Sequence, residues 1–161
     1  MNDLWIPPRL GTLLAATAWT CLVAVAAAHA QEDRAPSVPA DEDAIRAVVE
    51  GFHEALSSGD STRALGYLHP DLVVYEGGHA ETLDEYRSGH LAGDIAFSGA
   101  VEFTTTRDAV ISGRDNSLYL REYSITGTYR DRAIDAHGVE TIVLARTGEG
   151  WRIRHIHWSS R

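Results

Sequence analysis

The chain has 161 residues, a formal net charge of −9 and no lysine. An acidic domain repels phosphate backbones and anionic lipid head groups, so nucleic acid is not an expected partner. The single cysteine, Cys21, and the single methionine, Met1, both lie among the first 30 residues. If that segment is removed, the mature protein has no thiol, thioether or side-chain amine. Cysteine catalysis, disulfides, thiolate metal sites and Schiff-base chemistry are then excluded.

Residues 1–30 have the pattern of an export signal. Arg9 precedes an apolar stretch over residues 10–28, and Ala28-His29-Ala30 matches the small-x-small cleavage pattern. Cleavage there makes Gln31 the first mature residue and places the protein in the periplasm or outside the cell, free of the membrane. An uncleaved membrane anchor is the alternative, because the apolar stretch is nearly long enough to span a bilayer. Residues 31–40 are expected to form a linker, which leaves residues 41–161 as one domain.

Helices are predicted in the first half of this domain. Asp41 caps a helix whose apolar residues recur at helical spacing up to Leu56, and Gly59 ends it. A short second helix follows and ends at Pro70. Residues 72–76 are predicted as a strand, and Thr82 opens a third helix through a capping box with Glu85.

After residue 99 the hydrophobic period changes to two, which predicts strands. The expected strands cover residues 101–111, 118–129, 139–146 and 151–159, and the segment 130–138 is expected to be a turn. Three helices followed by long antiparallel strands indicate an α+β fold. Long curled strands with helices on one face would make a cone with an open mouth.

The order of these elements resembles the SnoaL-like branch of the nuclear-transport-factor-2-like superfamily. The resemblance rests on Phe52 in the opening helix, the break Ser58-Gly59-Asp60, His69-Pro70-Asp71 before the first strand, and the closing Gly150–Ser160 hairpin with its Gly-Trp-Arg-Ile start. It covers residues 41–161 and implies a cup formed by a curved antiparallel or mixed sheet with three N-terminal helices. That superfamily includes isomerases, dehydratases, cyclases, epoxide hydrolases and non-catalytic binding or dimerisation modules, so the resemblance leaves the activity open.

The last strand carries the most informative polar pattern. Because strand side chains alternate, Trp151, Ile153, His155 and His157 share one face, which we expect to line the cup. Imidazoles two residues apart on a strand have Cβ atoms about 6.6 Å apart and can meet on one metal ion or one substrate.

Other elements are expected to add polar groups to the same cup. The third helix should point His90 inward, and His79 should lie near the mouth. Tyr75 and Glu76 are adjacent on a strand, so one of them must face inward. Glu122 lies among apolar neighbours on another strand. His53, His69 and His137 are expected to be structural.

Three functions follow from these candidates, and enzymatic activity stays open among them. The first is an exported pocket protein that binds a small ligand or a metal ion through His155, His157, His90 and His79 or Glu76. This ligand set suits Zn²⁺, Cu²⁺, Ni²⁺ or Fe²⁺. The second is a metal-free isomerase, dehydratase or cyclase that uses the same histidines with Tyr75 or Glu76 for acid–base chemistry on a small hydrophobic substrate. The third is a non-catalytic dimeric interaction module.

A homodimer is expected through the other face of the last strand. Ile156 and Trp158 form an apolar centre there, with Arg152 and Arg154 at its edge. Tryptophan and arginine are enriched at protein interfaces.

Overall fold

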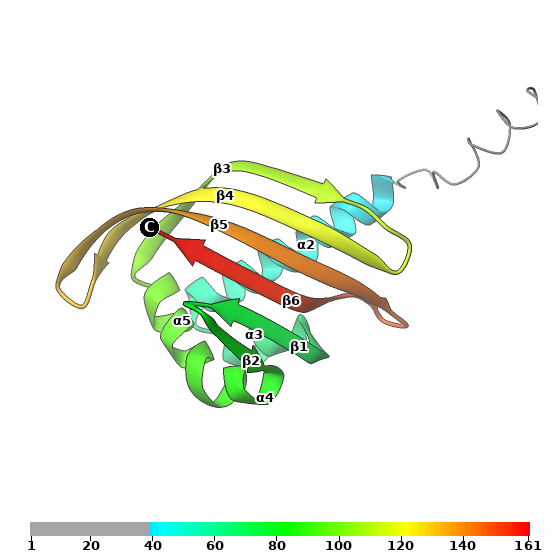
Figure 1. Cartoon of the computed structure of the whole chain (residues 1–161), viewed down its shortest axis with the longest axis horizontal. Coiled ribbons are helices and arrows are strands. Elements are labelled where there is room, and N and C mark those ends of the chain that lie inside the picture. Colours follow the sequence, from blue (N-terminus) through cyan, green and yellow to red (C-terminus); the bar gives the residue numbers. More distant parts are fainter. Residues whose placement is uncertain (1–38) are drawn as a thin grey trace, which may run out of the picture. The chain divides into compact units, whose positions relative to one another are not determined.

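The structure is a computed structural model that describes residues 39–161. The first 38 residues, which hold the predicted export signal and most of the predicted linker, lie outside the described residues. None of the described helices is both long enough and apolar enough to cross a membrane. The helices are α2 (Pro39–Ser58), α3 (Ser61–Gly66), α4 (Leu83–Glu85), the π-helical turn η1 (Tyr86–His90) and α5 (Leu91–Ser98). The strands are β1 (Leu68–Glu76), β2 (His79–Thr82), β3 (Val101–Ile111), β4 (Asn116–Tyr129), β5 (Arg132–Thr147) and β6 (Gly150–Ser160) (Figure 1).

The six strands form one mixed, curved sheet in the order β2-β1-β6-β5-β4-β3 (Figure 1). Neighbouring strands are antiparallel except β1 and β6, which are parallel. The long meander β3 to β6 comes last in sequence, and the helices lie against one face of the sheet (Figure 1). The predicted α+β fold is confirmed.

The core lies between α2 and the inner face of the sheet. Ile45, Val49 and Phe52 recur at helical spacing on α2, and all three are fully buried. They share one hydrophobic cluster with Ile142 of β5 and Ile156 of β6. The apolar stripe read from the sequence therefore fixes which face of α2 packs on the sheet.

Several boundaries differ from the prediction. β1 begins at Leu68 rather than at residue 72, and β2 was not predicted. β5 begins at Arg132, so most of the predicted turn over 130–138 is strand. The real turn is Arg130-Asp131, and both residues have positive φ, 51° and 61°, as a tight two-residue hairpin requires. An Arg-Asp pair lacks the Asn-Gly signature that marks such turns in sequence.

The register of β6 corrects the predicted face of the last strand. Leu144 of β5 pairs with Ile153, whereas the preceding Val143 pairs with His155, so Arg154 is an extra residue in β6. Such a bulge reverses the alternation of side chains. Trp151 and Ile153 therefore share the buried inner face with Ile156 and Trp158, and not with the two histidines.

Candidate active site: a cavity with two polar clusters

A cavity of about 740 Å³ lies between the helices and the inner face of the sheet. Aromatic and aliphatic side chains from α5, β3 and β4 form much of its wall, and these are Phe97, Val101, Phe103, Tyr123, Ile125 and Tyr129. Gly138 of β5 lets the Tyr123 ring pack against the sheet, because an added Cβ would lie 2.4 Å from the ring Cζ. A largely apolar cavity of this size suits a drug-sized organic molecule.

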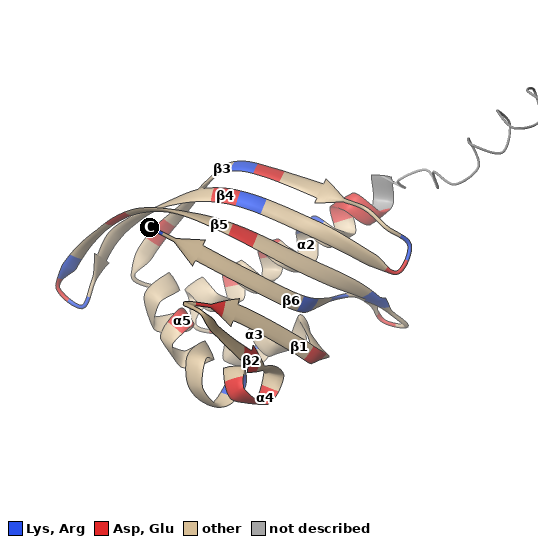
Figure 2. Cartoon of the chain, in the orientation of Figure 1, with Lys and Arg blue, Asp and Glu red and all other residues tan. Residues whose placement is uncertain are grey.

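Charged and polar side chains form a row across the inner face of the sheet. Arg121 of β4 pairs with Glu140 of β5, which pairs with Trp158 of β6. On the other side of β6, Tyr75 pairs with His157, which brings the next residue, Glu76, level with Trp158. Figure 2 shows charged positions side by side on β4 and β5 in the middle of the sheet. The Cα atoms of Glu76 and Arg121 are three strand spacings apart, about 14 Å. The cavity is lined by all four members of this row, Arg121, Glu140, Trp158 and Glu76.

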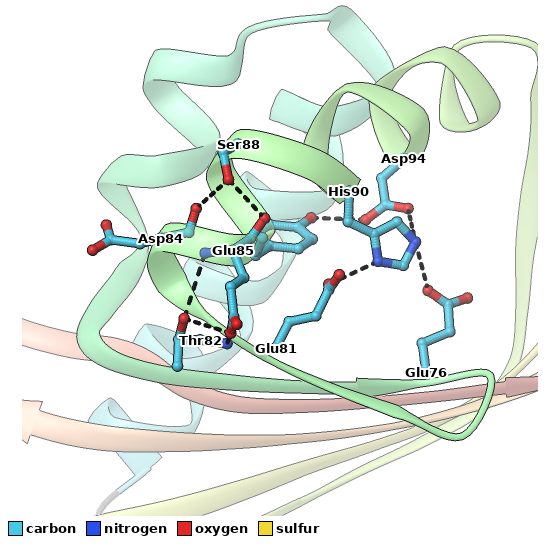
Figure 3. Close-up of polar contacts among 9 residues, drawn as sticks. Glu76, Glu81, Thr82, Asp84, Glu85, Ser88, His90 and Asp94 are labelled. Carbon is cyan, nitrogen blue, oxygen red and sulfur yellow. Dashed lines mark hydrogen bonds and ion pairs between the residues drawn. The ribbon is translucent and has the colours of Figure 1, made fainter.

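The first polar cluster surrounds the imidazole of His90 (Figure 3). Its Nε2 lies 3.2 Å from Oε2 of Glu76 and 3.5 Å from Oδ1 of Asp94. Its Nδ1 lies 2.9 Å from Oε2 of Glu81 on β2. The Tyr86 hydroxyl donates to Oδ2 of Asp94 at 2.8 Å. Glu76, His90 and Asp94 line the cavity, so three elements, β1, η1 and α5, meet at this point.

The local sequence explains how these side chains are placed. Thr82 and Glu85 form the predicted capping box, which starts α4 next to β2. The chain then passes through one π-helical turn, a distortion that recurs at functional sites. Tyr86 and His90 flank this turn and their rings contact each other, with centroids 6.0 Å apart. Tyr86 is fully buried and anchors the turn in the core.

Burial and neighbouring charges together raise the pKa values of Asp94, Glu76 and His90. Burial raises the pKa of Asp94 to about 6, against the opposing effects of the Tyr86 hydrogen bond and His90. Burial also raises the pKa of Glu76. Burial lowers the pKa of His90, but the hydrogen bond with Glu81 and the charges of Asp94 and Glu76 outweigh it, so that pKa is raised overall. Just above pH 6, a carboxylate base and an imidazolium acid therefore coexist side by side.

The second polar cluster joins His53 of α2 to the sheet. Trp158 donates from Nε1 to Oε1 of Glu140 at 2.6 Å, and Nε2 of His53 lies 2.9 Å from the same oxygen. Arg121 contacts Nδ1 of His53 at 2.9 Å. A guanidinium can only donate, so Nδ1 accepts and Nε2 carries the proton that is donated to Glu140. His53 is thereby held in one orientation between Arg121 and Glu140.

Glu140 stays ionised although its side chain is only 1% exposed. Burial alone would raise its pKa, but His53, Arg121 and Trp158 together lower it below the ordinary value. The Arg121 guanidinium lies over the Tyr123 ring at 4.5 Å, and its Nε is 4.0 Å from Oε2 of Glu140. This cluster is a buried, charge-balanced unit.

The structure brings two of the predicted site residues together, Glu76 and His90. Glu76 faces the cavity, whereas its neighbour Tyr75 is 47% exposed. His155 and His157 lie on the outer face of the sheet, where both rings contact Tyr75. The expectation that these two histidines line the cup is wrong, because of the bulge at Arg154. His79 is exposed at the start of β2.

The predicted four-histidine metal set is therefore not assembled. Among the described residues, one group of three or more His, Cys, Asp or Glu side chains has ligand atoms within 4.8 Å of one another, and it is Glu76, His90 and Asp94. This group could hold a metal ion. The expected dimer face is also corrected, because Ile156 is fully buried in the core and Trp158 lines the cavity.

Sequence reasoning missed Asp94, Arg121 and Glu140, and it treated His53 as structural. Asp94 could have been found, since it lies four residues after His90 on the same helical face. Glu140 offered a weaker signal, as a charged residue inside a run of apolar strand positions. Glu122, which was noticed for that reason, is exposed and faces away from the cavity.

Comparisons with known proteins identify the family. Residues 45–161 match the model of the SnoaL-like domain. The chain belongs to the SnoaL-like family. A search of curated proteins found no significant match.

Solved structures of the nuclear-transport-factor-2-like superfamily share the fold. A candidate ketosteroid isomerase from Shewanella frigidimarina is 32% identical, with a TM-score of 0.67 over 70% of this chain and 91% of that chain. A candidate dehydratase from Streptomyces avermitilis is 19% identical, with a TM-score of 0.64 over 73% of this chain and 93% of that one. The association domain of Caenorhabditis elegans calcium/calmodulin-dependent kinase II is 19% identical, with a TM-score of 0.59 over 74% and 95%. The last two likenesses concern the fold alone.

Proposed function

We propose that this SnoaL-like protein is an acid–base enzyme that binds a small, largely apolar molecule in its cavity and moves a proton on it. One observation carries the proposal: Nε2 of His90 lies between the carboxylates of Glu76 and Asp94 inside a cavity with a largely aromatic and aliphatic wall from α5, β3 and β4. Asp94 is the proposed general base, and the imidazolium of His90 is the proposed acid that returns a proton. Glu81, bonded to Nδ1, orients the ring.

The protonation states of the cluster support these roles. A general base works best when its pKa lies near the operating pH, and the pKa of Asp94 is raised to about 6. The Tyr86 hydroxyl fixes the direction of the carboxylate. The 32% identical structure described as a candidate ketosteroid isomerase favours the same reaction class, because isomerisation removes a proton and returns it elsewhere.

The test is proton exchange at a carbon acid. Deuterium incorporation from solvent into the carbons next to the carbonyl of 2-tetralone is followed by NMR. We expect the protein to accelerate exchange over buffer, with a rate that rises through about pH 6 as Asp94 loses its proton. Asp94→Asn should lower the rate by about 10²-fold or more. The exposed Asp84 of α4 gives the matched control, Asp84→Asn. Equal rates for wild type and Asp94→Asn, or no acceleration by wild type, would refute the proposal.

A divalent metal at the same cluster is the second candidate. Glu76, His90 and Asp94 offer ligand atoms within 4.8 Å of one another, and the Glu81 bond to Nδ1 leaves Nε2 free for a metal, an arrangement that recurs at metal-bound histidines. Titration of untagged protein with Zn²⁺ by calorimetry decides between the two. One tight equivalent that His90→Asn abolishes and His157→Asn retains would favour the metal. Exchange activity that survives a chelator, without tight Zn²⁺ binding, would favour acid–base catalysis.

Export and self-association belong to the proposal as expectations from the sequence. The intact mass of the secreted protein should match a chain that starts at Gln31, and a membrane-retained chain that still contains Cys21 would contradict export. Sedimentation of the mature protein tests the expected homodimer. Ile156 and Trp158 are engaged within the domain, so any dimer has to use another face.

A further inference from the structure

The guanidinium of Arg121 has unused hydrogen-bonding capacity next to the cavity. Its side chain is only 9% exposed. Within the described part of the chain it makes a single hydrogen bond, to Nδ1 of His53, and its Nε has no hydrogen-bond partner. A guanidinium has five N–H donors, so most of them are unmatched. Among these donors the Nε–H is buried, and leaving it unpaired is costly unless a ligand or water meets it.

These donors belong to the cavity that contains the His90 cluster. Arg121 lines the cavity, and its guanidinium lies over the rings of Tyr123 at 4.5 Å and Phe103 at 5.8 Å, which are themselves wall residues. The two aromatic faces and the bond to His53 fix its orientation. Arg121 is therefore a rigid donor at a defined distance across the sheet from Glu76.

Charge decides which kind of acceptor suits this position. Glu140 already balances Arg121, with Oε2 4.0 Å from Nε. Five acidic residues line the cavity, Glu54, Glu76, Asp94, Glu102 and Glu140, against one arginine. An anionic ligand would meet a surplus of negative charge, whereas a neutral oxygen acceptor would use the free donors without that cost.

We propose that Arg121 forms an oxygen-binding subsite, where it donates to the carbonyl oxygen of a neutral, apolar ketone or aldehyde. The inference rests on the proposed acid–base function and adds the substrate class and its orientation. With the oxygen at Arg121, a carbon next to the carbonyl is turned towards Glu76 and Asp94, and the rest of the molecule lies along the apolar wall. The Cα atoms of Glu76 and Arg121 are about 14 Å apart, and both side chains line the same cavity.

Binding of three matched probes tests the subsite without any need for turnover. The probes are 2-tetralone, tetralin, which lacks the oxygen, and tetralin-2-carboxylate, which is an anion. Binding is followed by the fluorescence of the wall residue Trp158 and by the infrared carbonyl stretch of ¹³C-labelled 2-tetralone. Wild type should bind the ketone at least about tenfold more tightly than either other probe, and the bound carbonyl stretch should shift to lower frequency.

Variants of Arg121 assign the effect to this side chain. Arg121→Met should remove both the ketone preference and the infrared shift while leaving tetralin binding unchanged. The double variant Arg121→Met/Glu140→Gln covers the case in which the single variant does not fold, because it leaves no unpaired buried charge. Arg107→Met is the control, since Arg107 is an exposed arginine on the neighbouring strand β3.

Each outcome has a defined meaning. An unchanged ketone preference in the folded Arg121 variants, tightest binding of the carboxylate, or no binding of 2-tetralone by wild type would each overturn the subsite. Arg121-dependent ketone binding without proton exchange would keep the subsite and refute the proposed catalysis. Proton exchange that does not depend on Arg121 would refute the subsite and keep the proposed catalysis.

Discussion

The two polar clusters of the cavity contain the same kinds of residue but differ in how many donors face each carboxylate. Oε1 of Glu140 is bonded to His53 and Trp158, and Arg121 lies close to Oε2, so the pKa of Glu140 is lowered despite deep burial. Asp94 has one close donor, Tyr86, and burial raises its pKa to about 6. The pKa values of two buried carboxylates in one cavity are thus shifted in opposite directions. The number of donors decides whether the carboxylate stays ionised or can exchange a proton.

The comparison also separates stability from activity. Around His90, three carboxylates share one imidazole, and their charges are not balanced within the cluster. Around Glu140, one carboxylate is matched by one guanidinium and by hydrogen bonds with His53 and Trp158. We therefore expect loss of the Glu140 carboxylate from the second cluster to destabilise the fold, and substitutions in the first cluster to change its chemistry.

Replacing Glu140 should destabilise the protein strongly. Glu140→Leu leaves Arg121 buried without its counter-ion and removes the acceptor of His53 and Trp158. The expected loss is about 3–5 kcal/mol of unfolding free energy, measured by urea denaturation at pH 7. Glu149→Leu, in the exposed turn before β6, is the control and should change stability little. A loss below about 1 kcal/mol for Glu140→Leu would show that the second cluster is not the rigid unit described.

Replacing Asp94 should have the opposite effect on stability. The folded-state pKa of Asp94 is raised to about 6, above the ordinary aspartate value, so the folded state holds the proton more tightly than the unfolded chain. The favourable contribution is full below about pH 4 and is lost as pH rises through 6. Asp94→Asn, which stays neutral, should therefore be more stable than wild type by about 1–2 kcal/mol at pH 7.5. The difference should vanish near pH 4, and a destabilised variant at pH 7.5 would contradict the assignment.

Removing the one close donor of Asp94 should raise its pKa further. The Tyr86 hydrogen bond lowers the pKa of Asp94, so Tyr86→Phe should move its titration upward from about 6 by roughly one unit, which corresponds to about 1.4 kcal/mol. NMR titration of ¹³C-labelled aspartate carboxylates measures the shift without any substrate. Tyr75→Phe, on the outer face, is the matched control. An unchanged or lower value for Asp94 would mean that Tyr86 does not set the protonation of the cluster.

The outer-face histidines should have no effect on the cavity. His155 and His157 contact Tyr75 on the side of the sheet away from the helices. The variants His155→Asn and His157→Asn should therefore keep wild-type proton exchange, 2-tetralone binding and Zn²⁺ titration. Loss of any of these in either variant would restore the original expectation that the pair lines the cup.

The sequence alone determined the layout of the domain. The apolar stripe of α2, the capping box at Thr82 and the period-two pattern after residue 99 are local signals, because they depend on spacing along one element. They led to the family, the fold and the inward position of His90. They did not single out Asp94 as its partner, since helical spacing alone does not show which nearby carboxylate is buried beside His90 in the cavity.

Which polar residues meet depends on contacts between segments that are distant in the sequence. One extra residue at Arg154 moved His155 and His157 to the outer face, because a strand has a side-chain period of two and a single bulge exchanges the faces. The neighbours of Glu140 come from α2, β4 and β6, whose alignment depends on strand register and helix packing. Register is set by the pairing of distant segments, so the same histidine and carboxylate types became one titrating cluster and one fixed ion-pair cluster for reasons that no local pattern contains.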